Sequence, residues 1–144
     1  MADQHDQHDI EALGDSLSAS ADALHAQLMC ALRQRPPGSA PAMPQGTAQA
    51  LFENEVLLRQ RANSLYLDSA KLAASGLGGA QQQLLEQTRR AQDAVARIDK
   101  VKDLVDLSAE LLSLGAAVAS GRPERLVTPL EKLKHHLDAL APPA

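Results

Sequence analysis

The chain has 144 residues and a formal net charge of −4, and leucine and alanine are its commonest residues, with 24 and 26 copies. This length suits one domain, and the charge lacks the basic excess that binding to a phosphate backbone needs, so we expect no nucleic-acid partner. With a single cysteine, an internal disulfide is also excluded.

Leucine and alanine favour helices, and the branched and aromatic residues that favour strands are scarce. We therefore predict an all-α fold, a helical bundle of about four helices, in a single domain at 9–140. The preceding residues 1–8 are polar and acidic and repeat Asp-Gln-His, which predicts a disordered tail. The chain does not open with the basic and then apolar run of a secretory signal, so we expect a cytoplasmic protein.

A first helix is predicted from about Asp9 to Arg33, because apolar residues recur there at three- and four-residue steps. Several prolines in the next segment, residues 36–46, exclude a helix and predict an extended linker. Such a linker allows the first helix to lie back along the rest of the domain. The apolar stripe of this helix consists of Ile10, Leu13, Leu17, Ala21, Leu24, Leu28 and Ala31.

Two longer helices are predicted at 47–75 and 80–120, because apolar residues recur every seven residues in both segments. The glycines between them favour a helix end and a tight turn centred on Gly78. Antiparallel pairing about this turn places Leu72 opposite Leu84, so we predict a long antiparallel helical hairpin with coiled-coil-like seams. The seams are Leu51, Leu58, Leu65 and Leu72 on one helix and Leu84, Ala91, Ile98, Val105 and Leu112 on the other.

After Asp103 the third helix has a wider apolar arc than one neighbouring helix can bury. The first helix, the last helix after Pro129 or a second molecule are the alternatives for covering it. We interpret the arc as a surface for a binding partner. The predicted partner-binding residues on it are Leu104, Leu107, Leu111, Leu114 and Val118.

The residues able to carry chemistry do not have the spacing of a catalytic or metal site. Cys30 needs a neighbouring base to act as a nucleophile, and His25 lies five residues away on a different helix face. The adjacent His135 and His136 point about 100° apart on a helix, so they do not share one metal ion. We therefore expect a protein that is not an enzyme and that has no cofactor and no metal.

These observations favour a non-enzymatic protein-binding module, a small cytoplasmic adaptor or chaperone such as an accessory of a bacterial secretion system. It would hold an amphipathic helix of another protein, or of a second copy, in a groove that the first helix covers until it is displaced. One alternative is an immunity protein that neutralises a toxin through Asp15 and Asp22 of the acidic first helix. Another is an amphipathic coat of a granule or membrane surface, although the few aromatic residues make a membrane partner unexpected.

Overall fold

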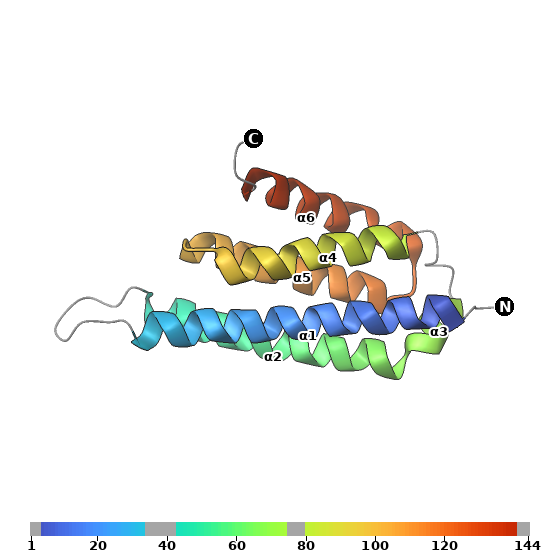
Figure 1. The fold of residues 1–144 in the computed structure, drawn as a ribbon, viewed down its shortest axis with the longest axis horizontal. Coiled ribbons are helices and arrows are strands. Elements are labelled where there is room, and N and C mark those ends of the chain that lie inside the picture. Colours follow the sequence, from blue (N-terminus) through green and yellow to red (C-terminus); the bar gives the residue numbers. More distant parts are fainter. Residues whose placement is uncertain (1–3, 34–42, 75–79, 141–144) are drawn as a thin grey trace.

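The computed structural model describes residues 4–33, 43–74 and 80–140, and these residues form helices without any strand (Figure 1). The predicted all-α fold is therefore confirmed. In chain order the helices are α1 (Gln4–Arg33), α2 (Gln45–Leu67), α3 (Ser69–Ala74), α4 (Gln81–Arg97), α5 (Val101–Ala119), the 3-10 helix η2 (Pro123–Arg125) and α6 (Val127–Leu140).

The long helices form two antiparallel pairs, and one pair lies on the other (Figure 1). The first pair is α1 with α2, and the second is α4 with α5. Across the layers α1 packs against α4 and α2 packs against α5, so the four helices follow one another around the bundle as α1, α2, α5 and α4. The last helix, α6, packs on the outside of α4 and α5.

The apolar stripe predicted for the first helix is buried along most of its length. Its members Ile10, Leu13, Leu17, Ala21, Leu24 and Leu28 are at most 2% exposed. Because α2 and α4 both pack on α1, removing α1 would open the core from two sides. Displacing the first helix, as the cover hypothesis requires, would therefore expose the core of the bundle rather than a groove on its surface.

The predicted hairpin pairs the wrong helices. Leu51, Leu58 and Leu65 are buried as expected, but α2 packs mainly against α1 and α5, and α4 lies diagonally opposite α2. The physical reason is α1, whose buried stripe supplies the seam of both α2 and α4. The predicted glycine turn at 76–79 lies outside the described residues.

The third predicted helix is interrupted, because α4 ends at Arg97 and α5 begins at Val101. At the break Ile98 has an extended backbone, with φ −64° and ψ 132°. The Gln27 side chain of α1 donates to the carbonyl oxygens of Val95 and Ile98, over 2.9 and 2.8 Å. Carbonyl groups at a helix end lack partners within the helix, so this amide stabilises the end of α4.

The break also changes which face of the chain is buried. Leu84 and Ala91 of the predicted seam are fully buried in α4, whereas Val105 and Leu112 are only partly buried in α5. The interruption rotates α5 about its axis relative to a continuous helix. Apolar residues other than the predicted seam residues of α5 therefore face the core.

Other helix boundaries also differ from the predictions. Because α1 begins at Gln4, residues 4–8 belong to a helix rather than to the predicted disordered tail, and the Gln7 side chain donates to Ser69 Oγ over 3.3 Å. The second predicted helix is divided at Asp68 into α2 and α3. Most of the predicted linker at 36–46 lies outside the described residues, although its last two residues already belong to α2.

Gln27→Ala should lower the free energy of unfolding by about 1–2 kcal/mol, because the carbonyl groups of Val95 and Ile98 lose their donor. Urea unfolding followed by circular dichroism measures this change. The matched control is Gln83→Ala at an exposed position of α4. Equal stability of the two variants would show that the Gln27 amide does not stabilise the break.

Gln81, the first residue of α4, is 2% exposed, and neither its Nε2 nor its Oε1 has a hydrogen-bond partner among the described residues. A buried polar group without a partner costs about 1–3 kcal/mol. Gln81→Leu should therefore raise the free energy of unfolding by about 1 kcal/mol, while Gln83→Leu should change it by less than about 0.5 kcal/mol. A urea midpoint of Gln81→Leu at or below that of the unsubstituted protein would contradict this expectation.

Candidate protein-docking surface

The five apolar residues of α5 predicted to bind a partner are not on the surface. Helix α5 packs against α2 and α6, and the leucines of α6 at 130, 133 and 137 are buried. The chain thus covers the wide apolar arc of α5 with its own helices, which corrects the prediction of an exposed flank. The buried residues are Leu104, Leu107, Leu111, Leu114 and Val118, each at most 4% exposed.

Ion pairs also attach α6 to the bundle. His136 lies between two carboxylates of α5, with Nδ1 2.7 Å from Glu110 and Nε2 3.7 Å from Asp103. On the α4 side, Arg90 contacts Asp138 over 3.0 Å. Two grooves of about 390 and 690 Å³ flank α6, and their linings include the paired residues Arg90, Asp103, Glu110 and His136.

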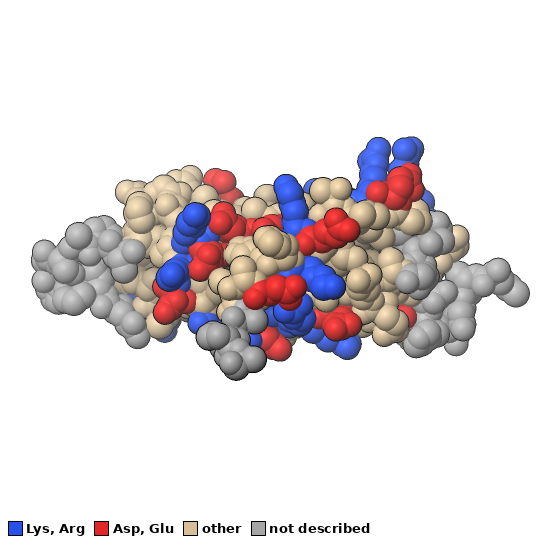
Figure 2. Space-filling model, turned by 90° about the horizontal axis from the view of Figure 1, so that it is seen from above, with Lys and Arg blue, Asp and Glu red and all other residues tan. Residues whose placement is uncertain are grey.

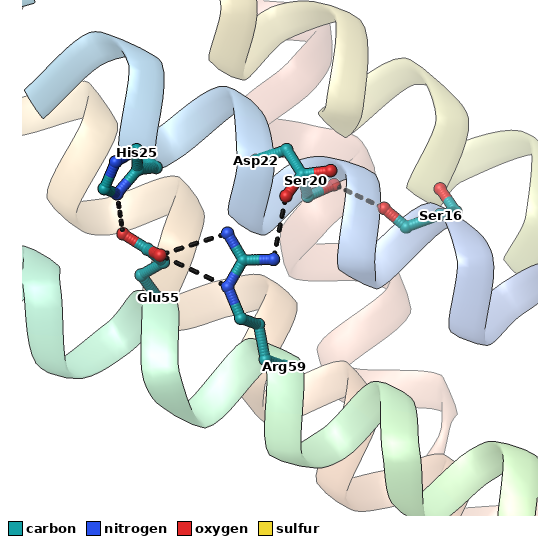
Figure 3. A network of polar contacts seen from close by, with 6 residues as sticks. All are labelled: Ser16, Ser20, Asp22, His25, Glu55 and Arg59. Atoms are coloured by element: carbon teal, nitrogen blue, oxygen red, sulfur yellow. Dashed lines mark hydrogen bonds and ion pairs between the residues drawn. The ribbon is translucent and has the colours of Figure 1, made fainter. Parts of the chain in front are cut away.

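Of the predicted binding residues, Asp15 and Asp22 of α1 are exposed, but both already have partners on α2. Asp22 accepts a hydrogen bond from Arg59 over 2.8 Å. The same guanidinium contacts Glu55 over 3.1 and 3.2 Å, and Glu55 contacts His25 Nδ1 over 2.8 Å (Figure 3). These acidic side chains therefore hold α1 and α2 together.

Glu55 is the buried member of this network, with 11% of its side chain exposed. A buried carboxylate is tolerated when hydrogen bonds and an opposite charge surround it, as Arg59 and His25 do here. The hydrogen bond to Asp22 is the largest influence that raises the pKa of Arg59 above its ordinary value, and Glu55 adds to it.

A second contact between the two helices involves Tyr66, whose hydroxyl donates to Asp15 over 2.5 Å. Its ring lies directly over Gly14, where a Cβ atom would come within 2.8 Å of the ring. Burial, followed by the hydrogen bond to Asp15 and the charges of Asp15 and Glu11, raises the pKa of Tyr66 to about 12. The absence of a Cβ atom at Gly14 therefore allows the ring to lie close to α1.

An apolar groove of about 910 Å³ lies where the end of α1 meets the first half of α2. Its exposed apolar side chains include Leu32 at 49%, Val56 at 53% and Leu57 at 42%. Phe52 is partly buried there and packs edge-on against His25, with ring centroids 6.4 Å apart. Its described lining is Leu32, Met43, Gln45, Ala48, Gln49, Phe52, Glu53, Val56 and Leu57, with Glu53 as the one charged member.

This groove was not predicted, although the sequence contains a signal for it. Val56 and Leu57 stand beside the buried seam residue Leu58 and point away from the neighbouring helices. On a helix of a soluble bundle those positions usually carry polar residues. Two apolar side chains at these positions, close to the single phenylalanine at 52, indicate the exposed apolar face of α2 more clearly than the leucine repeat does.

Comparisons with protein-family models, curated proteins and solved structures found no match to this chain. Among the described residues, no group of three or more histidine, cysteine or acidic side chains is placed to hold a metal ion. The described helices also include none with the length and hydropathy needed to cross a bilayer. Cys30 is exposed as a free thiol, and His25 is engaged with Glu55. The lining of the groove on α2 is predominantly apolar, which suits an apolar ligand.

The phenolate absorbance of Tyr66 should titrate near pH 12 in the folded protein, and no tryptophan or second tyrosine obscures it. Folding raises this pKa above its ordinary value of 10.0. The contribution of the protonated Tyr66 hydroxyl to the free energy of unfolding is therefore complete below pH 10 and is lost as the pH rises through about 12. Asp15→Asn should lower the midpoint but leave it above 10.0, since burial remains the larger cause.

Asp22→Asn is the matched control, because Asp22 pairs with Arg59 and should leave the titration of Tyr66 unchanged. A midpoint of 10.0 for the folded, unsubstituted protein would show that Tyr66 is not packed on α1 as described.

Proposed function

We propose that this protein is a non-enzymatic protein-binding module, a small cytoplasmic adaptor or chaperone that docks an apolar helix of another protein. The observation that supports this proposal is the groove of about 910 Å³, in which Leu32, Val56 and Leu57 remain close to half exposed. Grouped exposed apolar side chains are typical of interaction sites, whereas single ones are common on any surface. The docking surface therefore differs from the buried α5 flank predicted from the sequence.

An amphipathic helix fits this groove better than an extended segment does. The groove runs along a helix, and its edges offer side chains at helical spacing, as in other helix-in-groove interfaces. An extended strand would instead need an open sheet edge, and the described residues contain no strand. Burial of the half-exposed apolar side chains would supply the driving force for docking, partly offset by the translational and rotational freedom lost on association, so we expect weak binding.

The proposal is tested with a fluorescent synthetic peptide of leucine, alanine and lysine that forms an amphipathic helix. Fluorescence anisotropy measures its binding to the protein. Val56→Glu should weaken binding by about tenfold or more, since it places a charge within the apolar contact. The matched control is Val127→Glu on α6, because Val127 and Val56 are similarly exposed, at 56% and 53%.

Equal loss of binding in the two variants would show that the peptide recognises charge or general exposure rather than this groove. Tight binding by Val56→Glu would remove the groove as the docking surface. Circular dichroism verifies that both variants keep their helical content.

A further inference from the structure

The α2 side of the groove consists of two neighbouring rows of side chains, one apolar and one polar. Residues four apart on a helix lie one above the other, so each row follows the helix. Adjacent residues point about 100° apart, and accordingly Phe52 is partly buried while Glu53 is exposed. The apolar row is Ala48, Phe52 and Val56, and the polar row beside it is Gln45, Gln49 and Glu53.

Glu53 is the one charged residue of the described lining, and its carboxylate forms no ion pair or hydrogen bond with the other described residues. The nearby carboxylates of Asp22 and Glu55 differ, because both contact Arg59. A carboxylate only accepts hydrogen bonds, whereas the two glutamine amides of the polar row both donate and accept. The polar row therefore selects its neighbour most strongly at Glu53, where a cationic donor matches.

We propose that the occupant of this groove is a cationic amphipathic helix, with apolar side chains against Phe52 and Val56 and one lysine or arginine beside Glu53. This inference rests on the proposed function, because it names the kind of helix that the same docking surface takes. The lining on α2 runs from Gln45 to Leu57, about 18 Å at about 1.5 Å per residue. A partner helix of about three turns covers this length.

One basic residue on the partner matches the groove better than several do. Arg33 is exposed at the end of α1 and directly follows Leu32, which lines the groove. A second cation on the α1 side of the partner helix would be repelled by this guanidinium, since like charges close to each other disfavour association. The partner is therefore expected to have its basic residue beside Glu53 and neutral or acidic residues on the side towards α1.

An anionic occupant fits the groove less well. Fatty acids and anionic lipid headgroups carry negative charge, which Glu53 repels, and the net charge of the whole chain is −4. The described lining contains no basic side chain that would offset this repulsion. Charge therefore favours a cationic helix over an anionic lipid as the occupant.

Other faces of the bundle differ from the groove in how their charges are distributed. Figure 2 views the molecule from the α6 side and shows acidic and basic side chains interspersed over that face. On α4, Glu86 is exposed and lies outside the lining of the groove. Glu86→Gln changes the net charge by the same amount as Glu53→Gln, so it is the matched control for the charge of Glu53.

Three synthetic helical peptides test the inference by fluorescence anisotropy with the full chain. They share a stripe of leucine and alanine, have glutamine at the other polar positions, and differ in one residue beside the stripe, which is lysine, glutamine or glutamate. The lysine peptide should bind about two- to fivefold more tightly than the glutamine peptide, the usual strength of a partly exposed ion pair. The glutamate peptide should bind more weakly than the glutamine peptide.

Substitutions of Glu53 then assign this preference to one side chain. Glu53→Gln should abolish the difference between the lysine and glutamine peptides, Glu53→Lys should make the glutamate peptide the tightest, and Glu86→Gln should leave the order unchanged. Salt should weaken binding of the lysine peptide to the unsubstituted chain, because it screens the ion pair. The same salt should have little effect on binding to Glu53→Gln.

Equal binding of the three peptides, or a preference for lysine that persists in Glu53→Gln, would overturn the inference. The proposed function survives that result if the glutamine peptide still binds and Val56→Glu weakens its binding while Val127→Glu does not. If none of the peptides binds, both the inference and the proposed function fail.

Two further measurements identify a different occupant. Binding of the chain to phosphatidylglycerol vesicles that Val56→Glu abolishes would assign the groove to an anionic lipid surface. A dimer in sedimentation equilibrium of the free chain that Val56→Glu disrupts would assign it to a second copy. Either result would overturn the cationic helix as the occupant.

Discussion

The arrangement of the bundle depends on the break between α4 and α5, where the side-chain amide of Gln27 donates to carbonyl groups at the end of α4. Without an end at Arg97, residues 80–120 would form one rod of about 60 Å, at about 1.5 Å per residue. Such a rod cannot pack beside α1 with one half and beside α2 with the other. The hydrogen bonds from Gln27 satisfy the last carbonyl groups of α4, so the chain can reverse and return as α5. Every contact of α5 and α6 follows from this reversal.

Several charged side chains join neighbouring helices. Asp22 and Glu55 share Arg59 across α1 and α2, and His136 joins α6 to two carboxylates of α5. An isolated exposed ion pair contributes little to stability, but a buried carboxylate such as Glu55 is costly once its partner is removed. Since these acids are paired internally, the acidic balance of the sequence does not by itself indicate a basic partner.

Periodicity in the sequence predicted which residues are buried but not which helices meet. The stripe of α1 and the leucine repeat of α2 lie in the core as expected, because a helix with one apolar face must bury that face. The predicted helix pairing was wrong because a heptad pattern specifies a face and does not identify the neighbour.

The break at Ile98 has no local signal, since neither proline nor glycine is present there and the capping amide comes from Gln27, far away in sequence. The α5 arc correctly indicated several neighbours, and all of them belong to the same chain. The docking groove was missed because Val56 and Leu57 stand outside the repeat.

The central position of α1 has a consequence for how the protein is made. Helix α1 leaves the ribosome before α2 and α4, the two helices that pack against it. Until residue 97 has been synthesised, part of the leucine stripe of α1 remains without its neighbour, and a helix held mainly by tertiary packing is then marginal. The nascent chain therefore exposes a long amphipathic segment for most of its synthesis, and general chaperones of the cell bind such segments. The apolar stripe of α1 is fully covered only after α4 has been synthesised and has packed against it.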